Sequence, residues 1–305
     1  MARPIPFACP KCHNILSEAQ ASFACTACGK GYPSIDGIPS FVGEDAFYEG
    51  KWLEPDFSAG SPRNWLVKKE RFFLSGLRGR KGSVLDLGCG GGWKLFADVG
   101  VAVGVDVSLS SLRNARRLYS QVAQAKLSEL PFEDGSFDFV VSSDVLGHVS
   151  LEGKGTVLRE IYRVLKRGGR TLNYVETDGD DPIMRFAKGY PELYSKHIVE
   201  PEGHIGLERA AEVVSRFAGA GLRPVRVEFC YKGLTYAGRF VQYFDNEYKG
   251  KSAPVRGLVA ICKLATAAKP IELAANLGMS LLIELGDVVF PESWAGGIAV
   301  CFEKP

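Results

Sequence analysis

Two neighbouring apolar segments constrain the fold of this chain more than any other feature. Residues 84–92 read VLDLGCGGG, an apolar run with one carboxylate that ends in a glycine-rich turn. Residues 103–108 read VGVDVS, a second apolar run that ends in an acid. Short, nearly continuous apolar runs are typical of parallel strands that are buried on both faces. The two segments therefore predict adjacent parallel strands of an α/β sheet.

The ends of these predicted strands indicate a nucleoside site. Glycines allow backbone amides to approach a ligand without a clash at Cβ. Asp106, at the end of the second strand, is placed to accept both hydroxyls of a ribose. A tight turn without a ligand is the structural alternative. A nicotinamide cofactor is a third possibility, but Trp93 interrupts the G-x-G-x-x-G spacing that such sites favour.

Three further blocks follow in order along the chain. Residues 130–141 read LPFEDGSFDFVV, residues 144–149 read DVLGHV, and residues 158–169 read LREIYRVLKRGG. With the first two segments, they resemble the class I S-adenosylmethionine (SAM)-dependent methyltransferases of the type 11 branch, which includes ubiquinone-type enzymes. The resemblance extends over residues 70–177. It implies a Rossmann-like, seven-stranded α/β sheet and SAM as the cofactor.

The resemblance also implies a cofactor site. The glycine turn and its preceding acid would hold the methionine end, Asp106 the ribose, and a serine pair, Ser142 and Ser143, would face the methionine group. Lys126 stands where the family often has an Asp that binds the adenine amine, so only the backbone of Leu127 is expected to contact the base. The cofactor-binding residues predicted in this way are Asp86, Gly88, Cys89, Gly90, Asp106, Val107, Leu127 and Ser143.

The chemistry of methyl transfer leaves the catalytic residues open. The methyl group of SAM is already electrophilic, so the protein mainly aligns the acceptor and excludes water. A general base contributes only where the acceptor is a hydroxyl or an acidic carbon. Asp144 and His148 are the candidates, with Glu176 as a further possibility. Each also has a structural interpretation: a helix cap for Asp144, helix packing for His148, and a solvated loop acid for Glu176.

The first 41 residues contain two C-x-x-C pairs, Cys9 with Cys12 and Cys25 with Cys28. Four thiolates at this spacing are typical of a structural zinc site. So short a segment has too small a core to fold without metal. The alternative, disulfide pairing, is less favoured because the other four cysteines are scattered in apolar segments, which is usual in a reducing compartment. We therefore expect a zinc ribbon and a cytoplasmic location.

The charge of the chain bears on the acceptor. The 37 basic and 35 acidic side chains leave a net charge of only +2, which is little for a nucleic-acid-binding protein. The densest basic segment, residues 68–81, also reads as an amphipathic helix that packs on the sheet. We expect a small-molecule acceptor: a metabolite, a lipid or a sugar-linked intermediate. Two alternatives remain open: an rRNA or tRNA base methyltransferase that docks RNA with its ribbon, and a SAM-binding scaffold without activity.

The predicted organisation has three parts. Residues 1–41 form the ribbon, residues 42–81 a linker and a helical cover, and residues 82–305 the methyltransferase domain with an insertion at 232–295. The linker includes the aromatic residues Phe47, Tyr48, Trp52 and Trp65, of which Tyr48 and Trp52 are candidates for the acceptor pocket, with core packing as the alternative.

The elements of the third part can also be predicted. Parallel strands are expected near 83–87, 102–106, 122–126, 138–142 and 170–176, with a further strand at 224–231 and an antiparallel edge strand at 296–303. Two helices, about 254–267 and 270–286, are expected to be buried against the core, and contact with a membrane surface and a role as a lid are the alternatives. Charged residues interrupt this region too often for a membrane span, and no leader peptide is expected. The sequence does not predict the oligomeric state.

Overall fold

The computed structural model describes residues 4–19, 22–42, 49–51, 53 and 68–305. The candidates for the acceptor pocket, Tyr48 and Trp52, and the other named linker aromatics, Phe47 and Trp65, lie outside these ranges. Among the described residues, no helix is both long and apolar enough to cross a bilayer.

A seven-stranded sheet forms the centre of the molecule, in the order β10-β11-β9-β8-β5-β6-β7. Strands β5 to β9 are parallel to one another. The predicted Rossmann-like methyltransferase sheet is thus confirmed. The bounds are Gly82–Leu87 (β5), Gly100–Asp106 (β6), Gln121–Gln124 (β7), Phe137–Ser143 (β8), Leu165–Glu176 (β9), Arg223–Lys232 (β10) and Ala295–Glu303 (β11).

The last strand is antiparallel, as predicted, but its predicted position at the sheet edge is wrong. Strand β11 lies between β9 and β10 and pairs with both. Its residues are buried almost throughout, whereas the first four residues of β10 are exposed. An uninterrupted apolar strand such as β11 favours the interior of the sheet, and β10, with Arg223, Pro224 and Arg226, suits an edge.

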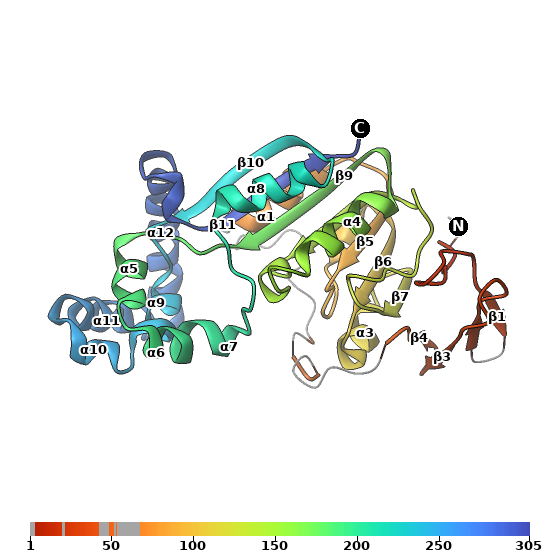
Figure 1. The fold of residues 1–305 in the computed structure, drawn as a ribbon. Coiled ribbons are helices and arrows are strands. Elements are labelled where there is room, and N and C mark those ends of the chain that lie inside the picture. The colour runs from red at the N-terminus through yellow and green to blue at the C-terminus, as the bar shows by residue number, and fades with distance from the viewer. Residues whose placement is uncertain (1–3, 20–21, 43–48, 52, 54–67) are drawn as a thin grey trace.

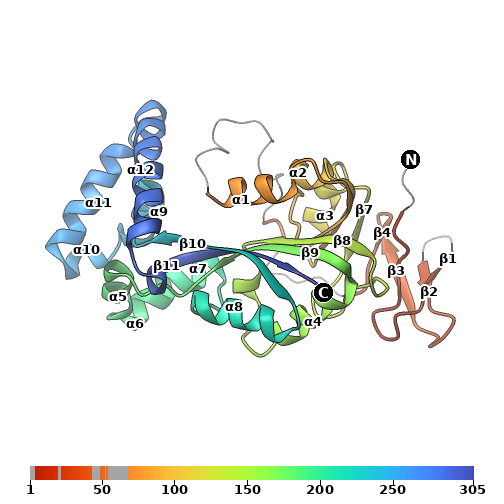
Figure 2. The same ribbon diagram turned by 90° about the horizontal axis from the view of Figure 1, so that it is seen from above.

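Helices cover both faces of the sheet, with α1, α2 and α3 on one face and α4 and α8 on the other (Figure 2). Two apolar cores result, because each amphipathic helix buries one stripe of side chains against a sheet face. These helices span Lys68–Leu77 (α1), Lys94–Ala97 (α2), Leu109–Ala115 (α3), Lys154–Val164 (α4) and Ala210–Gly219 (α8). A 3-10 turn, Leu146–His148, follows β8.

A separate group of helices stands beyond the ends of β9, β10 and β11 (Figure 1). It has its own small core, which includes Phe240, Phe244 and Tyr248. Its first part spans Pro182–Lys188 (α5), Pro191–Tyr194 (α6), a π-helical turn Ser195–Val199 and Glu200–Glu202 (α7). The predicted helical insertion supplies the rest: Ala237–Phe244 (α9), Tyr248–Lys251 (α10), Ala253–Ala265 (α11), Lys269–Val289 (α12) and a 3-10 turn Glu292–Trp294.

The expected burial of the last two insertion helices is wrong. Only Val255 and Val259 of α11, and four residues of α12, are buried. Eleven other large apolar side chains of the two helices are exposed, since the hairpin extends past the end of the sheet (Figure 2).

A four-stranded antiparallel sheet occupies the N-terminal part: Ser17–Ala19 (β1), Ser22–Ala24 (β2), Gly31–Ile35 (β3) and Ile38–Pro39 (β4). It packs against β7, the edge strand of the central sheet. The backbone N–H of Phe41 donates to the carbonyl of Gln124 on β7 (2.9 Å), and that of Ala8 to the carbonyl of Pro131 (2.9 Å). The N-terminal sheet thus protects an edge strand that would otherwise be open.

Candidate active site

A cavity of about 1080 Å³ opens at the carboxyl ends of the parallel strands. Four strands bring functional side chains to it: Asp86 on β5, Asp106 at the end of β6, Ser143 on β8 and Glu176 at the end of β9. Ligands bind at this edge in open α/β sheets, because the strand order changes there and opens a crevice. All eight residues predicted to bind the cofactor, and both catalytic candidates, line this one cavity.

The glycine turn after β5 has a conformation that other residues rarely adopt. Gly88 has φ +61° and Gly90 has φ +50°. A Cβ at Gly88 would also lie 2.8 Å from a methyl carbon of Val145. Glycine is therefore required here for both backbone conformation and space. Cys89, between them, is buried, and its burial raises the pKa of its thiol well above the usual value, so it does not act as a nucleophile.

Asp106, at the end of the neighbouring strand β6, binds the backbone of the glycine turn. Its Oδ2 accepts a hydrogen bond from the backbone N–H of Gly90 (2.9 Å), and its Oδ1 accepts one from the N–H of Ser108 (2.9 Å). Burial raises the pKa of Asp106, against the effect of these hydrogen bonds. The carboxylate is thus fixed in orientation at the wall of the cavity, which Val107 and Leu127 also line.

Asp86 has a partner that the sequence did not predict. The hydroxyl of Tyr119 donates to Oδ2 of Asp86 (2.5 Å) and accepts from the backbone N–H of Trp93 (2.7 Å). Tyr119 is buried, and a Cβ on Gly104 would lie 2.8 Å from its ring. A tyrosine among apolar helix residues ordinarily indicates packing, so only Gly104 in a buried strand hinted that a large side chain comes close.

The two serines at the end of β8 lie on opposite sides of the strand. Ser143 lines the cavity, but Ser142 is fully buried and donates to Oδ1 of Asn173 (2.7 Å). The expectation that both serines face the cofactor is therefore wrong for Ser142, because successive side chains of a strand alternate between faces.

Asp144 does not cap a helix. It has φ +58°, an uncommon conformation for an aspartate, and its Oδ2 binds Nζ of Lys69 on α1 (2.6 Å) and the hydroxyl of Ser143 (2.9 Å). Backbone strain of this kind is maintained by surrounding contacts and concentrates at functional sites. Asp144 thus ties α1 to the rim of the cavity.

His148 belongs to a cluster with His204 and Glu176. Its Nδ1 lies 3.1 Å from the carbonyl oxygen of Gly203, which can only accept, so Nδ1 carries the proton and Nε2 keeps a lone pair in the neutral ring. Burial, and then the nearby His204, lower the pKa of His148. Nε2 of His204 in turn donates to Oε2 of Glu176 (2.5 Å).

The His148 cluster can act in two ways. A neutral imidazole can accept a proton from a bound acceptor. The three residues also offer ligand atoms within 4.8 Å of one another, so a metal ion could be held there. Glu176 is not the solvated acid of the alternative interpretation, because it also lies 3.3 Å from Arg239 of α9.

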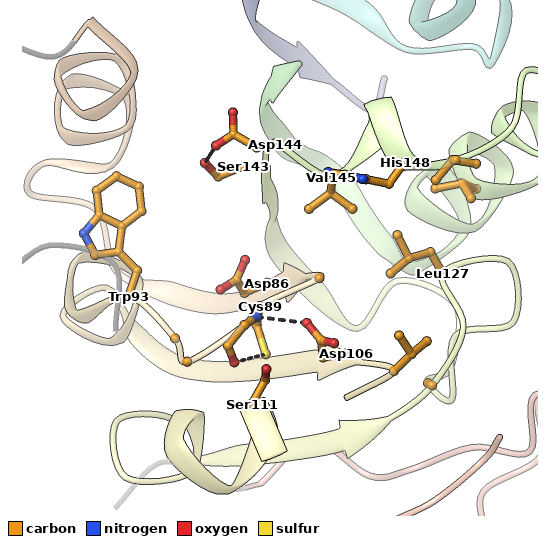
Figure 3. A pocket seen from close by; sticks show the side chains of 18 of the residues that line it. Asp86, Cys89, Trp93, Asp106, Ser111, Leu127, Ser143, Asp144, Val145 and His148 are labelled. Atoms are coloured by element: carbon orange, nitrogen blue, oxygen red, sulfur yellow. Dashed lines mark hydrogen bonds between the residues drawn. The ribbon is translucent and has the colours of Figure 1, made fainter. Parts of the chain in front are cut away.

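Arg239 brings the helical insertion to the cavity. Its guanidinium lies between Glu176 and Glu202 and over the ring of Tyr243. Glu202 and Arg239 both line the cavity, at the side where His148 lies. The acceptor end of the cavity therefore carries charge of both signs. Figure 3 shows Asp144 and His148 across the cavity from Cys89 and Asp106.

The four N-terminal cysteines converge as a metal site would require. The Sγ atoms of Cys9 and Cys28 are 3.6 Å apart, and those of Cys12 and Cys25 are 3.4 Å apart. Four thiolates around a tetrahedral zinc ion, at about 2.3 Å each, lie roughly 3.8 Å from one another. None of the eight cysteines, all of which are described, forms a disulfide. The donor set and its spacing therefore fit zinc.

Comparison with known proteins agrees with this fold and site. Residues 85–172 match the family described as "Methyltransferase domain". A provisionally named methyltransferase of Encephalitozoon cuniculi is 38% identical over 122 residues, which are 39% of this chain and 56% of that protein. The ubiquinone/menaquinone biosynthesis C-methyltransferase of Escherichia coli is 32% identical over 163 residues, 48% of this chain and 61% of the enzyme.

A solved structure shows the same fold over a larger part of the chain. Phosphoethanolamine N-methyltransferase 2 of Haemonchus contortus, in complex with phosphomonomethylethanolamine and S-adenosylhomocysteine, has a TM-score of 0.50 at 18% identity. The match covers 81% of this chain and 53% of that one. This chain spans only about half to three fifths of the length of the relatives named here.

Proposed function

We propose that this chain is a SAM-dependent methyltransferase that acts on a small-molecule acceptor. One observation carries the proposal: a single cavity holds both the predicted SAM-binding residues and the protonatable cluster of His148 and Glu176. The similarity of residues 85–172 to methyltransferase domains, and the small-molecule activities named for the relatives, support it.

Each part of the cavity has a role in this proposal. Asp106 accepts the ribose hydroxyls, and the backbone amides of the glycine turn, with Asp86, hold the amino-acid end of SAM. Bound SAM supplies an electrophilic methyl group. The protein then holds the acceptor in line with that group and keeps water out, with Trp93 and Phe96 on the cavity wall.

His148 is the proton acceptor in this proposal when the acceptor atom is a hydroxyl or an acidic carbon. Its neutral ring can take up a proton at Nε2, because Nδ1 faces the carbonyl oxygen of Gly203, and Asp144 has a different place, in contact with Lys69 and Ser143. Asp144 is instead a positioning residue that holds the α1 segment over the cavity. Arg239 and Glu202 are the side chains placed to select polar or charged groups on the acceptor.

The ion pairs made by the basic helix α1 support a small molecule rather than RNA as the methyl acceptor. Lys68 binds Asp287 (2.7 Å), Lys69 binds Asp144, and Arg71 binds Glu284. Phosphate binding would require these ion pairs to break. The small-molecule acceptors considered are a metabolite, a lipid or a sugar-linked intermediate.

The N-terminal part, residues 1–41, is a structural zinc ribbon in this proposal, followed by the cover at 42–81 and the methyltransferase domain at 82–305 with its insertion at 232–295. The ribbon packs on β7, and its small apolar cluster includes Cys9, Phe23 and Cys25. The eight free cysteines support a reducing compartment such as the cytoplasm.

Calorimetry with SAM and S-adenosylhomocysteine tests the cofactor, and transfer of labelled methyl groups to metabolite and RNA fractions tests the activity. We expect binding of both ligands and label in the metabolite fraction. Binding without transfer to any fraction would favour a scaffold, and label in RNA would favour the RNA enzyme. No binding by folded protein would overturn the proposal.

A further inference from the structure

The hairpin of α11 and α12 presents a large apolar surface to solvent. Among the described residues, sixteen large apolar side chains are exposed, and eleven of them lie on these two helices. Large exposed apolar patches on soluble proteins usually mark a surface that binds a partner or a membrane. We name these eleven the hairpin surface: Leu258, Ile261, Leu264, Ile271, Leu273, Leu277, Leu281, Leu282, Leu285, Val288 and Val289.

The exposed face of α12 is almost free of charge. Of its mainly exposed residues, only Lys269, at the N-terminal end, is charged. The acids of its last turns point toward α1, where Asp287 binds Lys68 and Glu284 binds Arg71. A helix with many exposed leucines and valines and so few exposed charges differs from the usual pattern of a solvated helix, so we expect an apolar medium on its outer side.

The most exposed charged residues of this region are basic, although Lys263 is paired with Asp245 (2.8 Å) and the side chain of Glu284 is 41% exposed. Residues 248–289 are all described, and within them every charged residue of the mainly exposed class is basic: Lys251, Arg256, Lys263 and Lys269. Arg256 and Lys263 lie on α11, about 20° apart around the helix at 100° per residue, and roughly 140–160° separate Arg256 from Leu258 and Ile261, so the cations and this apolar stripe lie on opposite sides. A helix with an apolar stripe on one side and cations on its polar side is typical of helices that lie in the headgroup region of anionic bilayers.

We propose that the hairpin surface binds the face of a lipid bilayer that contains anionic lipids. The leucines would enter the acyl boundary, and the four cations would contact the headgroups. No described helix is able to span a bilayer, so the contact is peripheral. A symmetric dimer through this surface fits less well, because it would bring the same four cations of both copies together.

This inference does not depend on methyl transfer. The hairpin lies at the opposite end of the molecule from the N-terminal sheet in both views (Figures 1 and 2). It packs on α9, the helix that carries Arg239 to the cavity, through a core that includes Phe240 and Val259. Binding to a bilayer would therefore hold the acceptor end of the cavity near the lipid.

Flotation of the full chain with vesicles tests the proposal. We expect binding to phosphatidylcholine vesicles with about 30% phosphatidylglycerol, weaker binding to pure phosphatidylcholine, and a decrease at high salt. The double variant Leu281→Glu/Leu285→Glu should lower the partition coefficient roughly tenfold or more. Arg256→Gln/Lys269→Gln should reduce the preference for the anionic vesicles and leave weak binding to neutral ones.

A matched control replaces two exposed apolar residues elsewhere, Leu151→Glu/Val225→Glu, and should bind vesicles as the unchanged chain does. Circular dichroism and SAM calorimetry establish that each variant is folded, so failure of lipid binding is distinct from failure of the proposed enzyme function. The proposal is overturned if the folded chain binds neither type of vesicle. If the unchanged chain self-associates without binding vesicles, and the glutamate variant does not self-associate, the surface is a contact between copies of the chain and the proposal is overturned.

Discussion

The hydroxyl of Tyr119 and the carboxylate of Asp86 form a 2.5 Å hydrogen bond beneath the cofactor cavity. The same hydroxyl accepts the backbone N–H of Trp93, so one side chain links the acid of β5 to the end of the glycine turn. Burial and the nearby Asp86 raise the pKa of Tyr119 well above its usual value, so the phenol stays protonated and acts as the donor.

Replacement of this tyrosine tests its importance. Tyr119→Phe leaves Asp86 and the Trp93 amide without their buried partner, at a cost of about 1–3 kcal/mol in the free energy of unfolding. We expect a lower melting temperature and weaker SAM binding, measured by scanning calorimetry and titration. Tyr162→Phe, on α4 at the other face of the sheet, is the control and should change neither. Equal SAM affinity and stability in Tyr119→Phe would show that the hydrogen bond has no role.

Asp106→Asn tests the ribose contact. The amide keeps the size of the side chain but can accept fewer hydrogen bonds and has no charge. Loss of charged hydrogen bonds worth about 1.5–3 kcal/mol should weaken SAM binding roughly 10- to 100-fold. Asp98→Asn, at an exposed ion pair with Lys94, is the matched control. An Asp106→Asn protein that binds SAM as tightly as the original would contradict the proposed cofactor site.

The pKa of His148 determines an expected pH dependence. Burial, followed by the proximity of His204, lowers this pKa below the usual 6.5. The ring is therefore neutral at pH 7 and accepts a proton, and kcat/KM should fall as the pH drops through the lowered pKa, below 6.5. The free energy of unfolding should also decrease as the pH falls. The reason is that His148 has a higher pKa in the unfolded chain, so the unfolded state binds the proton more readily than the folded state.

Variants of histidine separate this effect from general acid denaturation. His148→Gln should lower kcat for a hydroxyl acceptor by about 10²- to 10⁴-fold and remove the acid limb of the rate profile. His197→Gln should keep both, because His197 contacts Glu247 away from the cavity. An acid limb centred above pH 6.5, or one that persists in His148→Gln, would exclude His148 as the base.

Metal removal tests the cysteine site. Metal analysis of the full chain should give one zinc per chain, and Cys25→Ser should lower this content and unfold only the N-terminal sheet. Cys262→Ser, at a free cysteine of α11, should retain the zinc. Unchanged metal content in Cys25→Ser would mean that the four cysteines are not the ligands.

The cofactor side of the cavity was largely predictable because its signals are local. The glycine turn and Asp106 each follow directly from a buried strand, and parallel strands bring their carboxyl ends to one edge. The cluster around His148 was not predictable, since Glu176 and His204 reach it from a different strand and loop. Tyr119 was missed for the same reason: its partner Asp86 is distant in sequence.

The errors in the fold also have physical causes. The periodicity of α11 and α12 indicated the two helices, yet their apolar residues were assigned to the core because burial is the usual fate of leucine. The position of β11 depends on pairing with both β9 and β10, and strand order within a sheet has no local signature. The left-handed conformation of Asp144 likewise depends on contacts with α1.

The placement of β11 between β9 and β10 has a consequence for folding during synthesis. During synthesis, β9 and β10 leave the ribosome before β11, the strand that lies between them in the sheet. The helical insertion is synthesised after β10 and before β11. Throughout that interval each strand has an open edge able to pair with a neighbouring nascent chain. The nascent chain is therefore prone to aggregation at this stage, until residues 295–303 pair with both β9 and β10.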